Sequence, residues 1–148
     1  MARTKFNVSK NDGERTYDGI VFDSALEMRY YRDVLIPMVS DGTVISYELQ
    51  KTYELQPKFA HKGRNVQPIK YVADFFIEYS DGHTEVIDTK GYPDNVALLK
   101  RKMFWYHYPE VTYKWMTYVK KFGGWIEYEN YKKLKKEEKL SKTRRIDV

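Results

Sequence analysis

The most strongly patterned part of the chain is a pair of apolar segments joined by a short polar turn. Residues 71–79 read YVADFFIEY, residues 84–89 read TEVIDT, and the link between them begins with Ser80, Asp81 and Gly82. Aromatic and β-branched residues are typical of strands, and an Asp-Gly step is typical of a hairpin turn. Both segments carry apolar residues on both faces, which indicates strands with a neighbour on each side. We therefore expect an antiparallel hairpin at the centre of a sheet.

Each of these apolar strands contains one aspartate, and the pairing register decides whether the two aspartates meet. A two-residue turn would place Asp74 opposite Thr89 and point the two aspartates to opposite faces. A three-residue turn with Gly82 in the left-handed conformation would place Asp74 directly opposite Asp88, with Cβ atoms about 5 Å apart. Lys90 lies two residues beyond Asp88 and therefore shares its face. We expect the second register, because it gives two costly buried charges a shared cation.

Opposed carboxylates in apolar strands are destabilising unless a cation lies between them, so we expect a divalent metal. Oxygen ligands suit Mg²⁺, for which Mn²⁺ is the expected substitute. A metal held by two carboxylates beside a lysine is the outline of a site for phosphodiester hydrolysis. The metal lowers the pKa of a bound water, and the Lys90 ammonium orients that water or stabilises developing charge. The alternative for Asp88 and Lys90 is a surface ion pair at a strand end.

A third carboxylate, Glu27, stands near the start of the first expected helix. It is a candidate further metal ligand, directly or through water. Residues 24–27 also have the S-x-x-E form of a capping box, in which Glu27 would only cap the helix with Ser24. Both interpretations stay open at this level. The histidines show no metal-ligand spacing and are expected at the surface, and most tyrosines and tryptophans are expected in the core. The histidines are His61, His83 and His107.

The remaining periodicities predict a mixed architecture. The expected elements are a flexible arm or small hairpin over 1–19, a helix from Asp23 to Pro37, one long or two short strands over 43–55, a loop over 58–68, a helix from Pro93 to before Pro109 with Val96, Leu99, Met103 and Tyr106 on one face, a strand over 111–119, and a final helix from Trp125 after the break at Gly123-Gly124. The crossover within 84–119 is long enough to make its two strands parallel. We therefore expect an α/β fold, of the α+β mixed-sheet kind, with helices packed on the sheet.

Length and composition exclude several classes of protein. A chain of 148 residues fits one domain, spanning 1–148. The absence of cysteine excludes a disulfide framework, a thiolate zinc site and a cysteine nucleophile, and it favours a reducing compartment. No apolar run approaches the roughly 20 residues of a membrane helix. No apolar stretch of the kind found in a secretion signal follows residues 1–5. We expect no contact with a membrane.

The net charge of +5 is concentrated in a basic C-terminal tail. Residues 132–148 hold eight basic and three acidic residues, whereas the other 131 residues carry equal numbers of each sign. One interpretation is a solvated, fraying helix end. The other is an electrostatic contact to a polyanion, most often nucleic acid.

Asp74 followed by Asp88-Thr89-Lys90 resembles the signature of the PD-(D/E)XK nuclease superfamily, with Asp88-x-Lys90 as its (D/E)-x-K element. Glu27 matches the acidic residue that many members carry on the leading helix, and Ala73 stands where the motif has proline. The superfamily implies a restriction-endonuclease-like core of order α-β-β-β-α-β, here followed by a C-terminal helix. Several wider segments resemble a small phage-encoded family of endonucleases described as Holliday-junction-resolvase-like. These segments are 22–27, 55–59, 71–75, 88–91 and 100–104, within a resemblance that covers about residues 5–120.

The resemblance implies a Mg²⁺-dependent DNA endonuclease acting on branched or recombination DNA, as a homodimer, in the cytoplasm of a bacterial host cell. Asp74, Asp88 and the backbone carbonyl of Thr89 would bind the metal, Glu27 would assist, and Lys90 would be the catalytic lysine. Candidate phosphate contacts are Lys58, Lys62, Arg64, Lys100, Lys102, Lys139, Lys142, Arg144 and Arg145. Two alternatives remain: a non-catalytic DNA-binding subunit that keeps the nuclease fold, and a structural phage protein with an incidental motif. Gln56, inside one matched segment, receives no role.

Overall fold

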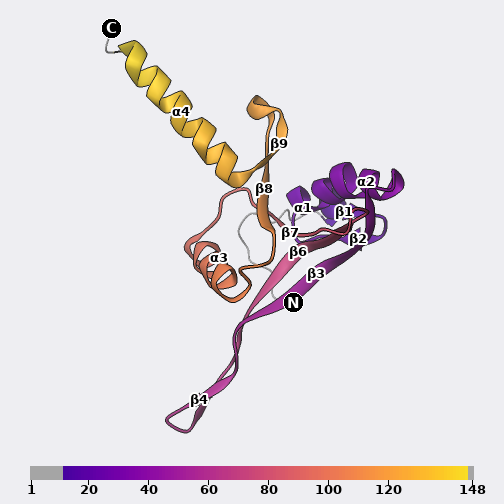
Figure 1. Cartoon of the computed structure of the whole chain (residues 1–148), viewed down its shortest axis with the longest axis vertical. Coiled ribbons are helices and arrows are strands. Elements are labelled where there is room, and N and C mark those ends of the chain that lie inside the picture. Colours follow the sequence, from indigo (N-terminus) through magenta and orange to yellow (C-terminus); the bar gives the residue numbers. More distant parts are fainter. Residues whose placement is uncertain (1–11, 147–148) are drawn as a thin grey trace.

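The computed structural model describes residues 12–146 and has a mixed α+β fold built on a five-stranded sheet (Figure 1). The strands of this sheet are β3 (Val44–Gln56), β6 (Ile69–Tyr79), β7 (Thr84–Thr89), β8 (Tyr113–Val119) and β9 (Gly124–Glu127). They lie in the order β3-β6-β7-β8-β9, with β7 and β8 parallel and the other neighbours antiparallel. The mixed sheet and the central position of the β6–β7 hairpin are therefore as predicted.

The turn between β6 and β7 has the predicted three-residue form. Gly82 adopts a φ of 92°, which is the left-handed region that glycine tolerates best. Phe75 pairs with Ile87, and the pairs nearer the turn keep the same register. Continuing this register by one residue brings Asp74 opposite Asp88. The predicted juxtaposition of the two aspartates is confirmed.

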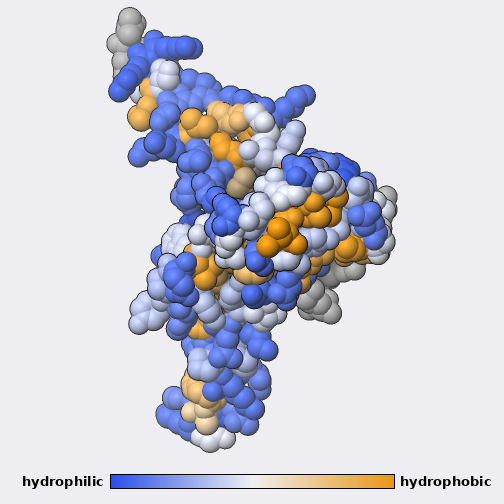
Figure 2. Space-filling view, turned by 45° about the vertical axis from the view of Figure 1, so that its right-hand side comes forward, coloured by the Kyte–Doolittle hydropathy of each residue, from blue (hydrophilic) through white to orange (hydrophobic). Residues whose placement is uncertain are grey.

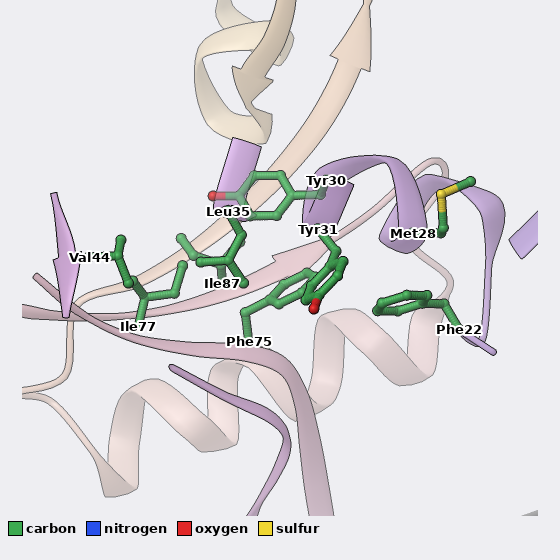
Figure 3. Close-up of a cluster of buried hydrophobic side chains, with 9 residues drawn as sticks. All are labelled: Phe22, Met28, Tyr30, Tyr31, Leu35, Val44, Phe75, Ile77 and Ile87. Atoms are coloured by element: carbon green, nitrogen blue, oxygen red, sulfur yellow. The ribbon is translucent and has the colours of Figure 1, made fainter. Parts of the chain in front are cut away.

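Helices cover both faces of the sheet. Val86 and Ile87 are consecutive on β7, so they point to opposite faces, and both are buried. Ile87 belongs to a cluster with side chains of α1 (Ala25–Tyr30) and the helical turns that follow it (Figure 3). Val86 belongs to a second cluster with Phe104 of α3 (Asn95–His107). The fold therefore has two small cores, one on each side of β7.

The N-terminal helix is longer than predicted. Helix α1 begins after Ser24, whose hydroxyl accepts the N–H of Glu27 at 3.0 Å. It continues through a π-helical turn, Tyr31–Leu35, into α2 (Ile36–Ser40). Pro37 lies in the first turn of α2, a position that proline tolerates. The prediction that the helix ends at Pro37 was therefore wrong.

The predicted loop over 58–68 is also wrong, because this segment forms a hairpin. Strand β4 (Phe59–His61) pairs with β5 (Arg64–Val66). Lys62 and Gly63 connect them, with φ values of 49° and 77°. Two successive residues with positive φ are typical of a type I′ turn, which usually carries Asn-Gly or Asp-Gly. Because Lys62, rather than Asn or Asp, occupies the first position, the sequence did not indicate this turn.

The last helix begins later than predicted. Residues 124–127 form β9 at the edge of the sheet, so α4 (Tyr128–Ile146) starts at Tyr128 rather than at Trp125. Helix α4 contacts β8 and β9 at its first turns and then projects away from the body (Figure 1). Figure 2 shows mainly hydrophilic residues over both the α4 projection and the β4–β5 hairpin at the opposite end of the molecule.

Of the apolar face predicted for α3, Met103 packs against the core cluster of Phe104, but the other three residues face solvent. Val96 and Leu99 are each 59% exposed and Tyr106 is 82% exposed, whereas Phe104 is fully buried. Trp105 is also exposed, at 46%. Most of the described tyrosines and tryptophans are buried or half-buried, as expected, and Trp105 and Tyr106 are among the exceptions. The three histidines are exposed, as expected.

Residues 1–11 of the expected N-terminal arm lie outside the described residues. From residue 12 onward, a 3₁₀ turn (Asp12–Arg15) leads into a small hairpin of β1 (Thr16–Tyr17) and β2 (Ile20–Val21). Of the two alternatives for residues 1–19, the described part adopts the hairpin. Between residues 12 and 146, no helix is long and apolar enough to cross a membrane.

Candidate metal centre

The two aspartates meet where the β6–β7 ladder opens. The last backbone pair before this point is Phe75 with Ile87. Beyond it, Asp88 Oδ1 accepts the N–H of Asp74 at 3.2 Å. Asp74 Oδ2 accepts the N–H and the hydroxyl of Thr89 at 2.8 and 2.9 Å. Each carboxylate therefore replaces a backbone partner of the neighbouring strand, and these charge-assisted hydrogen bonds offset part of the cost of burying it.

Lys90 lies beside Asp88, as predicted from their spacing. Its Nζ is 2.8 Å from Asp88 Oδ2. The pair is not at the surface, because the Asp88 side chain is 3% exposed and the Lys90 side chain is 25% exposed. The backbone N–H of Lys90 donates to the carbonyl of Met116 on β8 at 2.9 Å, and its Nζ lies 5.5 Å from the centre of the Trp115 ring. Strand β8 therefore holds the lysine against the carboxylates.

Glu27 reaches this centre from helix α1. Its backbone N–H completes one half of the expected capping box with Ser24. Its carboxylate is buried, and Oε1 accepts a hydrogen bond from Gln50 Nε2 at 2.7 Å. It also lies close enough to Asp74 and Asp88 to shift the ionisation of the group. Glu27 therefore both takes part in the N-terminal cap of α1 and adds a third carboxylate to the cluster.

Gln50 is a member of the site that sequence reasoning missed. It has a φ of 58°, in the left-handed region that ordinary residues rarely adopt. The β3–β6 ladder continues on both sides of it but skips Gln50, which lies opposite Asp74. Strained backbone of this kind is concentrated at functional sites. In the alternating pattern of β3, Gln50 is only one more polar residue, so no signal in the sequence distinguished it; Gln56, the glutamine in a matched segment, ends the strand instead.

At the same point, the odd-numbered side chains of β3 and β6 move from one side of the sheet to the other. Phe75 belongs to the cluster of Figure 3, and Leu49 packs against that cluster. Tyr71 belongs to the α3 cluster, and Tyr53 packs against it. All four are odd-numbered residues of β3 and β6, and in a regular strand such residues would share a face. The change coincides with the left-handed residue, Gln50. The carboxylates therefore lie where the two cores meet.

Three carboxylates in this cluster face one ammonium group. Burial raises the pKa of Glu27 to about 8, and the charges of Asp23 and Asp88 add to this effect. Burial and the charges of Asp88 and Glu27 hold the pKa of Asp74 well above its usual range. Burial disfavours the charged form of Lys90, but the charge and hydrogen bond of Asp88 outweigh it, so the pKa of Lys90 is raised. Burial and mutual repulsion thus disfavour the ionised forms of Glu27 and Asp74, and a bound cation would favour them.

A hard divalent cation fits this surplus of buried carboxylate oxygen. In proteins Mg²⁺ is usually held by one or two carboxylates and keeps several waters, without an all-protein cage. Asp74 and Asp88 supply two carboxylates, and the Thr89 carbonyl is the third ligand that the resemblance implies. Within residues 12–146, no three histidine, aspartate or glutamate side chains are arranged to hold a metal together. A cation at Asp88 Oδ2 would also compete with the Lys90 ammonium.

The candidate DNA contacts fall into three separate regions. Lys58, Lys62 and Arg64 lie on or beside the β4–β5 hairpin, Lys100 and Lys102 on α3, and Lys139, Lys142, Arg144 and Arg145 on α4. The hairpin and α4 project from opposite ends of the molecule (Figure 1). The structure therefore does not gather these cations into one patch around the carboxylates.

Comparison with known proteins places the chain in a family without assigning it an activity. No curated protein matches the sequence significantly. A family model described as "Protein of unknown function (DUF1064)" matches residues 3–124. This span includes all of the carboxylate centre and the β4–β5 hairpin, and it ends before α4. Because the match covers most of its length, the chain belongs to the DUF1064 family.

Proposed function

We propose that the protein is a metal-dependent DNA endonuclease that hydrolyses phosphodiester bonds. The observation that carries the proposal is the juxtaposition of Asp74 and Asp88 across β6 and β7, with Lys90 Nζ 2.8 Å from Asp88. Two opposed carboxylates with a lysine at their side suit a phosphate substrate, because the reaction needs a cation, an attacking water and a donor for developing negative charge.

Asp74, Asp88 and the backbone carbonyl of Thr89 would hold the metal, with Glu27 assisting directly or through water. Bound there, Mg²⁺ or Mn²⁺ would supply Lewis-acid chemistry and a water of lowered pKa. Lys90 keeps its proton, since its pKa is raised, so its ammonium is available to donate a hydrogen bond to a phosphate oxygen or to orient a water. Gln50 holds the carboxylate of Glu27 through its amide.

The proposal extends to the fold family and the substrate. The resemblance of Asp74 and Asp88-x-Lys90 to the PD-(D/E)XK signature favours a restriction-endonuclease-like core and branched or recombination DNA as substrate. It also favours a homodimer, since resolution of a junction needs two cuts, and the cytoplasm of a bacterial host. The cations on the hairpin, α3 and α4 would contact phosphates.

A non-catalytic DNA-binding subunit is the second candidate. It is favoured by the engagement of both Asp88 oxygens, one by the Asp74 N–H and one by Lys90. In that case the ion pair would replace the metal permanently, and the basic regions would carry the function alone.

The test is a cleavage assay on duplex, flap and four-way-junction DNA, with Mg²⁺, Mn²⁺ or EDTA. The wild type should cut at least one of these substrates with either metal and none in EDTA. Asp74→Asn keeps the shape and the acceptor for Thr89 but removes a charge, so it should abolish cutting while binding persists. Calorimetric titration with Mg²⁺ gives a second readout, because a structural protein with an incidental motif should bind no metal. Absence of cutting on all three substrates with both metals would refute the nuclease proposal.

A further inference from the structure

The β4–β5 hairpin extends from the body as an arm, here called the hairpin arm, residues 57–68. Every residue from 57 to 65 is exposed, and the arm supplies no side chain to either hydrophobic cluster. Figure 1 shows it projecting from the ends of β3 and β6, away from the helices. A two-stranded hairpin that stands alone is marginally stable in water. The arm therefore contributes no side chain to the hydrophobic clusters, and its exposed surface is available to bind a partner.

The charge of the arm indicates the chemistry of that partner. No acidic residue lies between Glu54 and Asp74. The cations in this interval are Lys58, Lys62, Arg64 and Lys70. None of these four forms an ion pair within the described part of the chain, whereas Arg101, Lys114 and Lys121 elsewhere are each paired with a glutamate. A projecting ribbon with only unpaired positive charge is complementary to a polyanion.

The width of the arm, and the residues on its two faces, suit binding in a groove of duplex DNA better than binding to the outside of the DNA backbone. Its strands lie about 5 Å apart, and the major groove, about 12 Å wide, admits a two-stranded ribbon. The β4–β5 pairing places His61 opposite Arg64 on one face and Ala60 opposite Asn65 on the other. Phe59 shares the face of His61 and is 43% exposed. Arginine reads the guanine edge through two hydrogen bonds, and an aromatic side chain can contact a thymine methyl group.

We infer that the hairpin arm lies in the major groove of the duplex beside the cleaved bond, with its His61–Arg64 face toward the base edges. Lys58 and Lys62 contact the phosphates that border the groove. This inference rests on the proposed function, since it assigns the DNA that the carboxylate centre acts on. It adds a specific contact to base edges, whereas the other basic regions serve phosphate binding.

The test compares three single substitutions in the exposed arm, in the full chain. Affinity for a labelled duplex and for a four-way junction is measured in EDTA, and guanine N7 methylation is scored for interference with binding. Arg64→Ala should weaken binding by about 5- to 100-fold, the range for one bidentate base contact. Arg64→Lys keeps the positive charge but loses the two parallel N–H donors of the guanidinium group, so it should weaken binding almost as much. Asn65→Ala, on the opposite face, is the matched control and should bind as the wild type does.

Methylation interference separates groove contact from phosphate contact. In the wild type, methylated guanines within one short stretch should block binding, and this block should disappear in Arg64→Ala and Arg64→Lys. If Arg64→Lys binds as the wild type does and methylation blocks nothing, the arm contacts phosphate only and the inference is wrong. A change in sedimentation of Arg64→Ala without a change in DNA affinity would make the arm a protein interface, which also overturns it.

The outcomes also separate this inference from the proposed function. If the wild type cuts DNA and all arm variants behave like it, the arm inference fails and the nuclease proposal stands. If the wild type shows the arm-dependent interference but cuts nothing with either metal, the arm inference stands and the protein is a DNA-binding subunit. If the wild type binds no DNA, both are wrong.

Discussion

Strand β7 carries two carboxylate–lysine pairs that look alike in isolation. Asp88 pairs with Lys90, and Glu85 pairs with Lys114. Both carboxylate side chains are nearly buried, at 3% and 9% exposure, and both lysines are partly exposed, at 25% and 37%. The two carboxylates lie three residues apart on the strand, so they point to opposite faces.

The neighbours of the two pairs differ. Glu85 faces Lys114 and the hydroxyl of Tyr79, so its charge is balanced. Burial alone would raise the pKa of Glu85, but the hydrogen bonds from Lys114 and Tyr79 outweigh it, and the pKa is lowered. Asp88 shares Lys90 with Asp74, and the carboxylate of Glu27 acts on both aspartates. A buried ion pair alone therefore does not distinguish the candidate site. The feature that distinguishes it is the group of additional carboxylates around the Asp88–Lys90 pair.

The largest expected difference between the pairs is in catalysis. Lys90→Ala should lower the cleavage rate by about 100- to 1,000-fold, the range for loss of one group that stabilises transition-state charge. DNA affinity should change little, because many other cations remain for binding. Lys114→Ala is the matched control, and it should cut at the wild-type rate although its melting temperature falls. Single-turnover rates at saturating enzyme measure both.

Two results would break this comparison. Wild-type turnover by Lys90→Ala would remove the lysine from the mechanism. An equal loss of rate in Lys114→Ala would show that both pairs act only through the stability of the sheet.

Gln50 provides a second test of the difference between the two pairs, because it holds Glu27, the third carboxylate of the Asp88 cluster. Gln50→Ala removes the hydrogen bond that holds Glu27 and should lower activity by about 10- to 100-fold, as is typical for groups that orient metal ligands. Gln50→Gly should lower activity equally but melt at a higher temperature than Gln50→Ala, because glycine adopts the φ of 58° without strain. Cleavage rates, Mg²⁺ titration and thermal melts of both variants are the measurements. A melting temperature of Gln50→Gly at or below that of Gln50→Ala would contradict the assignment of strain to this position.

Much of this centre was predictable because it depends on local rules. The turn at Ser80-Asp81-Gly82 sets the register of the hairpin, and the register brings Asp74 opposite Asp88 and sets Lys90 on the same face. Local turn rules allowed two registers, and the cost of burying two separate aspartates decided between them. Once the three-residue turn is chosen, the rest follows from strand periodicity and the preference of glycine for positive φ. The hydrogen bonds of Asp74 to Thr89 follow from the same geometry.

What could not be predicted depends on tertiary contacts that override local preference. The Glu85–Lys114 pair joins residues far apart in sequence and is invisible in any pattern. In α3, the side facing the sheet carries Arg101, whose guanidinium carbon lies 4.1 Å from the centre of the Trp115 ring and which pairs with Glu129 at 2.5 Å. Sequence patterns assign arginine to solvent, so the orientation of α3 could not be derived from its apolar stripe.

A smaller difference should appear in stability without metal. Burial and the charges of Asp88 and Glu27 disfavour the ionised form of Asp74 in the folded protein. Asp74→Asn is neutral and keeps the acceptor for Thr89, so it should stabilise the protein in EDTA by about 1 kcal/mol. It is a cleaner substitution than Asp88→Asn, which would also leave Lys90 without its partner. Glu85→Gln on the other face should destabilise by about 1 to 2 kcal/mol, since it removes a paired charge. Urea melts in EDTA measure both.

Added metal sharpens the same measurement. Mg²⁺ should stabilise the wild type and Glu85→Gln alike, because that gain follows occupancy of the folded state. It should not stabilise Asp74→Asn. If Asp74→Asn is less stable than the wild type in EDTA and gains as much from Mg²⁺, then Asp74 and Asp88 do not share a cation.

The smallest expected effect is the pH dependence of the Glu85–Lys114 pair. The pKa of Glu85 is lowered from its ordinary value of 4.5 in the folded protein. A carboxyl group with a lowered folded pKa adds stability at pH values above its unfolded pKa and loses that contribution as pH falls through the folded pKa. The stability difference between the wild type and Glu85→Gln should therefore be constant above about pH 5.5 and shrink below about pH 4.5. Urea melts of the two proteins in parallel pH series measure this difference, and all other titrations cancel between them. A difference that stays constant down to pH values well below 4.5, or that grows as pH falls, would show that Glu85 is not stabilised as a carboxylate, and the contrast between the two pairs of β7 would then rest on the Asp88 side alone.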